Sequence, residues 1–146
     1  MIKGVLAKDH RPYIKVIIGW KQVVQVLPVL IDTGFNGELK IPERTVRELG
    51  LEITHITAVL LADETGKEVP ASLAHISLES TRKMVNVIVA ASIPTIGTKL
   101  LNDFGYKLAV NFVSREVVLD TEINNEDVDD VMEDIRKEVK DNLGDE

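Results

Sequence analysis

Short hydrophobic runs that alternate with polar residues fill the first 120 positions of the chain. This pattern predicts β-strands over 13–18, 22–31, 38–41, 53–62, 67–78, 84–90, 106–112 and 116–119. Pro28 predicts an edge position or a bend within the second run. Asp63-Glu64-Thr65-Gly66 predicts a hairpin turn between the fourth and fifth runs. Strands of this length and spacing indicate a mainly β barrel or sandwich.

Two short helices interrupt the strands. Pro42 and Gly50 frame residues 43–49, which predicts a helix with proline at its start and glycine at its end. Residues 98–103 predict a second helix that ends near Gly105.

The pattern changes to a helical period after Thr121, which predicts two parts: a domain over 1–120 and an acidic helical tail over 121–146. Apolar residues three and four positions apart predict an amphipathic helix, with Asn125 as its N-cap; they are Val128, Val131, Met132, Ile135 and Val139. We expect this stripe to pack on its own barrel. Pairing with a second subunit or with a foreign partner are the alternatives.

Charge separates the same two parts. Residues 120–146 hold 12 acids and 3 bases, whereas the other 119 residues hold 12 acids and 14 bases. The body has no stripe of Lys and Arg interleaved with aromatic residues, so no nucleic-acid partner is expected. No apolar stretch is long enough for a membrane span, so no membrane partner is expected either. The absence of cysteine excludes disulfides and thiolate chemistry and suits the cytoplasm.

Asp32 is the candidate for chemistry. It follows the apolar run Val29-Leu30-Ile31 and precedes Thr33 and Gly34, a pattern that presents a carboxylate from a tight turn. Two carboxylates in contact cannot both ionise and therefore share one proton. The ionised member can then activate water while the protonated member polarises a carbonyl. Since the motif occurs once, this chemistry requires a symmetric dimer. A structural turn at Asp32 is the alternative.

Three segments resemble the retropepsin-like, single-domain aspartic proteases, the clan that includes retroviral proteases. Residues 11–19 are similar to the strand before the active loop of that family, and residues 30–34 to the catalytic loop itself. Thr95-Ile96-Gly97-Thr98-Lys99-Leu100-Leu101 is similar to a second signature that threads beside the loop. Asp32-Thr33-Gly34-Phe35 looks most like an uncharacterised prokaryotic group. The resemblance covers about residues 10–120 and implies a closed acid-protease barrel with two short helices.

The resemblance also implies residue roles. Asp32 would be the catalytic carboxylate, and Thr33 would form hydrogen bonds between subunits beneath it. Gly34 would let the loops of two subunits approach, and Gly97 would belong to the supporting loop. The hairpin over 60–69 would be the flap that closes over a bound peptide. The candidate substrate-contacting residues are Phe35, Ala62, Asp63, Glu64, Thr65 and Gly66.

The chain departs from the viral pattern at three places. Phe35 stands where viral members have Ala or Ser, and the flap tip is charged rather than glycine-rich. The acidic helix replaces the short terminal strand by which viral subunits interlock.

The sequence thus favours a homodimeric aspartic endopeptidase that cuts a peptide or protein substrate and needs no metal or other cofactor. His10, His55 and His75 lack metal-ligand spacing. A catalytically inactive binding or assembly module on the same fold is the alternative. A third hypothesis, ranked last, is a regulatory partner protein.

Overall fold

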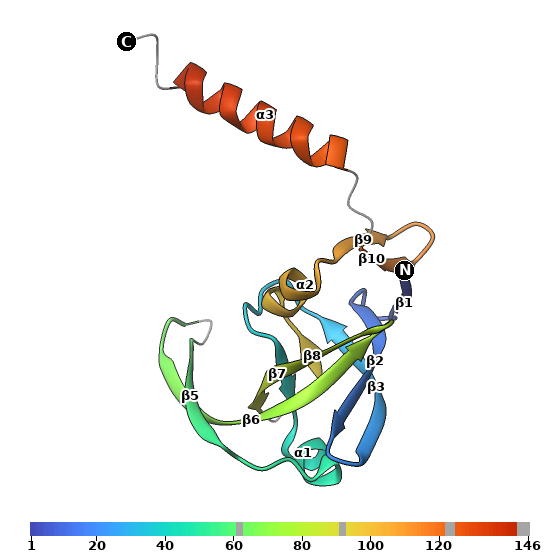
Figure 1. Ribbon diagram of the computed structural model, residues 1–146, viewed down its shortest axis with the longest axis vertical. Coiled ribbons are helices and arrows are strands. Elements are labelled where there is room, and N and C mark those ends of the chain that lie inside the picture. Colours follow the sequence, from blue (N-terminus) through green and yellow to red (C-terminus); the bar gives the residue numbers. More distant parts are fainter. Residues whose placement is uncertain (61–62, 91–92, 122–124, 143–146) are drawn as a thin grey trace.

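The computed structural model describes residues 1–60, 63–90, 93–121 and 125–142 (Figure 1). The strands in these ranges are β1 (Ile2–Leu6), β2 (Pro12–Trp20), β3 (Val23–Ile31), β4 (Leu39–Ile41), β5 (His55–Leu60), β6 (Gly66–Leu78), β7 (Thr81–Val89), β8 (Thr95–Ile96), β9 (Lys107–Asn111) and β10 (Glu116–Asp120). The helices are α1 (Glu43–Leu49), α2 (Thr98–Phe104) and α3 (Asn125–Asn142).

The strands form one sheet that closes on itself. Their order is β5-β6-β7-β4-β8-β3-β2-β1-β10-β9, and a further pairing of β6 with β2 closes six of the strands into a barrel. The predicted mainly β barrel with two short helices and a C-terminal helix is confirmed. Closure gives each of the six strands a neighbour on both sides, and aliphatic side chains fill the inside of the barrel.

Alternation along each strand builds the barrel core. In β2, Ile14, Val16 and Ile18 are almost completely buried, whereas Lys15 and Ile17 between them are exposed. Each fully buried side chain of this size contributes about 2 kcal/mol by leaving water. The aliphatic core therefore holds the barrel with few aromatic residues.

One short strand threads between the two segments that flank Asp32. β8 runs parallel to β3, with Leu30 opposite Thr95 and Ile31 opposite Ile96. On its other side β8 pairs antiparallel with β4, where Leu39 lies opposite Ile96. This crossing fixes both ends of the loop that joins β3 to β4.

The local signals for turns and ends are borne out. Gly50 and Gly105 end α1 and α2 with φ of 68° and 71°, a left-handed conformation that glycine adopts without strain. Pro28 pairs with Lys15 of β2 on one side only, because β8 reaches no further than Leu30. Its missing N–H therefore costs no ladder hydrogen bond.

β1 is a strand that the sequence pattern did not predict. It pairs with both β10 and β2 and so joins the two ends of the domain. Gly4 in its centre faces the backbone carbonyl of Tyr13 so closely that an added Cβ would collide with it. The glycine that breaks the alternation in the sequence is thus required by the close approach of β2.

The long hairpin of β5 and the first half of β6 extends away from the barrel (Figure 1). His55 to Leu60 pair with Ala71 to Gly66, and β5 ends the sheet with its outer edge unpaired. We call this element the flap hairpin.

The expectation that the apolar stripe of the tail packs on its own barrel is wrong for the side chains that the structure describes. Met132, Ile135 and Val139 are 44, 48 and 50% exposed, and α3 stands apart from the barrel in Figure 1. The physical reason is that the barrel closes without the tail. Val117 and Leu119 of β10 already complete its core just before Thr121.

Candidate active site

Asp32 lies at the end of β3, where the chain leaves the barrel. Its backbone N–H donates to the carbonyl of Ile96 at 3.0 Å, which extends the β3–β8 pairing by one residue. Its carbonyl accepts from the N–H of Phe35 at 3.1 Å and so closes a tight turn. Asp32 is half-buried, while Thr33 and Gly34 are exposed. The turn thus presents the carboxylate at the surface of a fixed backbone.

The carboxylate of Asp32 is held by its own loop. The backbone N–H of Gly34 donates to Oδ1 at 2.9 Å. A Cβ on residue 34 would lie 3.2 Å from the same oxygen, so glycine gives the carboxylate room as well as a donor. The arrangement orients the group before any second carboxylate arrives.

Gly97 supports the loop from behind. An added Cβ there would lie 2.5 Å from the carbonyl oxygen of Phe35 and even closer to that of Gly37. The same region is tied by the N–H of Gly97 to the carbonyl of Glu38 at 3.1 Å, and by the N–H of Thr98 to the carbonyl of Phe35 at 2.8 Å. Only glycine leaves space for backbone to pack on backbone at this point.

A cavity of about 340 Å³ opens beside Asp32. Its walls come from Arg11 and the start of β2, the end of β3, the loop and β9. The residues are Arg11, Pro12, Leu30, Ile31, Asp32, Thr33, Leu108 and Val110. Arg11 donates through Nε to Asp9 at 2.6 Å, and this hydrogen bond raises the pKa of Arg11. The charge of Asp32 acts in the same direction, so a permanent cation lies near the carboxylate.

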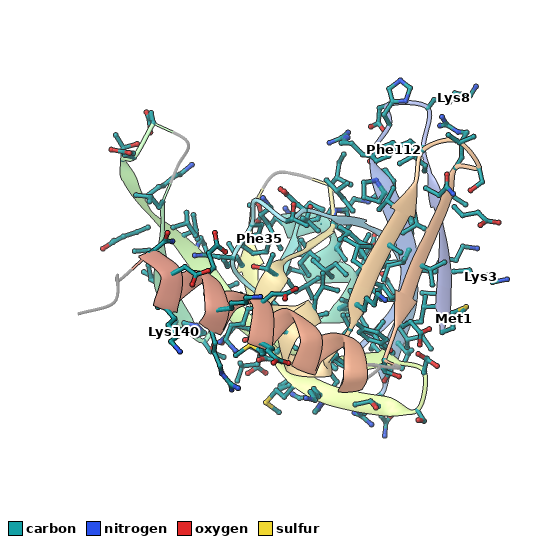
Figure 2. The ribbon with its side chains drawn as sticks, turned by 90° about the horizontal axis from the view of Figure 1, so that it is seen from above. Met1, Lys3, Lys8, Phe35, Phe112 and Lys140 are labelled. Atoms are coloured by element: carbon teal, nitrogen blue, oxygen red, sulfur yellow. The ribbon has the colours of Figure 1, made fainter. Side chains whose placement is uncertain are left out.

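A second cavity, of about 200 Å³, lies between the loop and the flap hairpin. Its walls are apolar and come from Phe35, Val59, Leu60, Val69, Ile88 and Ala90. Lys40 and Lys67 complete its lining. Figure 2 shows Phe35 in the middle of the molecule, on the side toward the flap hairpin. The candidate substrate residue Phe35 therefore faces the element proposed to cover the substrate.

The tip of the flap hairpin is held by its own polar residues. Asp63 Oδ1 accepts from the backbone N–H of Thr65 at 3.1 Å and from its hydroxyl at 2.6 Å. The hydroxyl bond is the main reason that the pKa of Asp63 lies below its ordinary value. Glu64 between them has φ of 67°, and Gly66 has open space around it. The remaining candidate of this group, Ala62, lies outside the described residues.

Two solved structures are similar to this chain in fold. One is the crystal structure of a retropepsin-like aspartic protease from Rickettsia conorii, with a TM-score of 0.55 and 16% sequence identity; the match covers 81% of this chain and 87% of that one. The other is EIAV protease complexed with the inhibitor HBY-793, with a TM-score of 0.55 and 20% identity, over 70% of this chain and 96% of that one. The fold is retropepsin-like. No protein-family model and no curated protein matches the sequence.

Within the retropepsin-like fold, the structure brings Asp32, Thr33, Gly34, Phe35 and Gly97 together at one end of the barrel. The tip of the flap hairpin does not contact Asp32 by any hydrogen bond recorded among the described residues. Sequence reasoning did not single out Arg11, Lys40 or Lys67 as site residues. Lys40 stands between Leu39 and Ile41, whereas Arg11 and Lys67 lie in charged stretches where nothing marks them out from their neighbours.

Other kinds of site find little support in the ranges that the structure describes. No group of three or more His, Asp or Glu side chains there is placed to hold a metal ion. No helix among the described residues is both long and apolar enough to cross a membrane. Trp20 stacks on His75 with ring centres 5.9 Å apart and packs against the barrel core.

Proposed function

We propose that the chain is an aspartic endopeptidase that works as a homodimer, with one Asp32 from each subunit and no metal or cofactor. The observation that carries the proposal is the position of Asp32. It stands at a strand end braced by β8, with its carboxylate held by the Gly34 amide, in a retropepsin-like fold. The proposed activity follows that of the two proteases with a similar fold. The choice of Asp32 as the catalytic residue follows the geometry of its loop.

The proposed reaction uses the two carboxylates as a pair. One Asp32 is ionised and takes a proton from water as the oxygen attacks the scissile carbonyl carbon. The other is protonated and donates to the carbonyl oxygen, which gives a neutral gem-diol. As the C–N bond of the diol breaks, the newly protonated Asp32 donates its proton to the leaving amine nitrogen, and the other Asp32 takes a proton from a diol hydroxyl. The pair is left with one shared proton, and the products are a carboxylic acid and an amine. No covalent intermediate with the protein forms.

The dimer is part of the mechanism because the sequence contains a single Asp-Thr-Gly. Thr33 and Gly34 are exposed beside Asp32 and are thus available to a second loop. A two-fold axis next to Asp32 would bring both carboxylates and both Thr33 side chains together. Like charges in such contact raise one pKa of the pair and produce the shared proton.

The test combines mass and activity. Light scattering across a concentration series should give the mass of a dimer under conditions in which a peptide library is cleaved. The Asp32→Asn variant should keep its circular dichroism spectrum and lose at least about 10³-fold in turnover. Asp103→Asn, which removes a surface carboxylate of α2, is the matched control and should cleave like the wild type. Equal turnover in Asp32→Asn would contradict the mechanism.

The alternative is a binding or assembly module without catalysis. Phe35, half-buried in the place of a small residue, and the charged flap tip favour it. It predicts a strict monomer, or a dimer that cleaves no peptide in the library while an Asp32→Asn variant binds peptides as the wild type does. Either result would move this function ahead of the peptidase.

A further inference from the structure

The cavity under the flap hairpin has an unusual pair of cations in its lining. Lys40 lies on β4 opposite Ile88 of β7, and Lys67 lies on β6 opposite Val59 of β5. The two lysines thus come from the floor and from the cover of the same cavity. Because Leu39 and Ile41 point into the barrel core, Lys40 between them points out of it.

Both lysines lie beside apolar side chains of the cavity lining. Lys40 Nζ lies 5.0 Å from the centre of the Phe35 ring, close enough for a cation–π contact. In the part of the chain that the structure describes, neither Lys40 nor Lys67 forms an ion pair. Lys40 is half-buried and Lys67 is exposed, so both ammonium groups keep contact with water at the rim of the cavity and can meet an anion that enters it.

The cavity is also in the right place for a substrate side chain. Phe35, one of its walls, is bonded through its N–H to the carbonyl of Asp32 at 3.1 Å. A peptide lying in extended form between Asp32 and the flap hairpin would pass over Phe35. Alternate side chains of such a peptide point in opposite directions, so one of them would enter the cavity.

We propose that this cavity is a specificity subsite for an acidic side chain of the substrate, glutamate above all. The inference rests on the proposed peptidase function and names its substrate class. The two methylenes of glutamate fit the apolar walls, and its carboxylate reaches the amines of Lys40 and Lys67. Aspartate is one methylene shorter and reaches them less well. Glutamine fits the walls but offers no charge, and lysine or arginine is repelled.

The decisive experiment uses matched peptides that differ only by Glu or Gln at one position. Cleavage sites are first found with a library, and each position around the cut is then varied. We expect kcat/KM for Glu to exceed that for Gln by about tenfold at one position, as two partly exposed ion pairs together allow. In the Lys40→Met, Lys67→Met double variant, which keeps the apolar stems, this ratio should fall toward one.

Lys15→Met is the control, because Lys15 is an exposed lysine on β2 that does not line the cavity. Like each of the other two substitutions, it removes one positive charge. It should keep the wild-type ratio of kcat/KM between the Glu and Gln peptides. A ratio near one in the wild-type protein would overturn the proposal. So would a ratio that survives the double substitution, since the selectivity would then come from elsewhere.

A binding measurement separates this proposal from the peptidase itself. Fluorescence anisotropy with labelled Glu and Gln peptides is measured on the Asp32→Asn variant with and without the two Lys→Met changes. Lysine-dependent preference for the Glu peptide supports the subsite even if the wild type cleaves nothing. Cleavage without such preference leaves the peptidase standing and removes the subsite. Absence of both cleavage and binding overturns the two proposals together.

Discussion

The Asp32 loop and the flap hairpin are built on opposite principles. Backbone bonds tie the loop on two sides, from Ile96, Gly97 and Thr98 into the segment between Asp32 and Glu38. The flap hairpin has only its own two strands, and the outer edge of β5 is unpaired. In the proposed peptidase, the carboxylate of Asp32 needs a fixed position, whereas the flap hairpin must admit and release a peptide. The two adjacent elements thus differ in how many backbone hydrogen bonds tie them to the rest of the chain.

The largest expected effect tests the rigid side. Gly97→Ala should lower the free energy of unfolding by about 3 kcal/mol, because the new methyl group meets two backbone carbonyls that cannot move aside. Gly66→Ala is the matched change in the flap hairpin, where nothing lies within 4 Å of an added Cβ. It should leave stability unchanged or raise it by about 0.5 kcal/mol. Urea unfolding measures the free energy of unfolding of both variants. Equal losses of stability would contradict the difference between the Asp32 loop and the flap hairpin.

Hydrogen exchange should resolve the same contrast residue by residue. We expect the amides of Phe35 and Thr98 to exchange only through global unfolding, since their bonds join distant parts of the chain. Amides that pair β5 with β6 should exchange through local opening, with a free energy at least about 2 kcal/mol lower. Mass spectrometry or NMR provides the measurement. Protection of the flap hairpin at the global value would show that it is as fixed as the loop.

The smallest effect concerns the tip of the flap hairpin and its pH dependence. The pKa of Asp63 is depressed, chiefly by the hydroxyl of Thr65, so the folded turn favours the ionised form. The contribution of this group to the turn is complete above the ordinary pKa of aspartate, and is lost as pH falls through the depressed value. An NMR titration should show the Asp63 pKa returning upward in Thr65→Val, with the unfolding midpoint unchanged. No movement of the pKa would disprove the assigned cause.

The fold was predictable where one local signal decides the outcome. Alternation identified most strands, and Gly50 and Gly105 marked the ends of the two short helices. β1 was missed because Gly4 interrupts its alternation, and only the approach of Tyr13 explains that glycine. β8 is two residues long and has no pattern of its own. The prediction that the tail packs on the barrel was wrong because an amphipathic pattern shows only that a helix has an apolar stripe. It does not show which surface covers that stripe.

The candidate site divides in the same way. Asp32, Gly34 and Gly97 lie in short motifs that are contiguous in the sequence, so the sequence alone identified them. Lys40 and Lys67 are 27 positions apart on different strands and line one cavity only because β5 and β6 lie beside the loop. Arg11 comes close to Asp32 by the same kind of tertiary approach. A charge in the sequence does not tell which distant segment it will lie beside, so these placements required the structure.

The bond from Thr98 to Phe35 spans 63 positions of the chain. Contacts of such separation cost more loop-closure entropy than local ones do, and they slow folding. During synthesis, the barrel strands up to β7 emerge before the segment that braces Asp32. In a nascent chain, the turn at Asp32 therefore has only its own bonds, from the amides of Gly34 and Phe35, until residues 95–98 have left the ribosome. Because β8 is made after most of the barrel strands, the loop around Asp32 gains its bonds to Ile96, Gly97 and Thr98 only when the barrel is nearly complete.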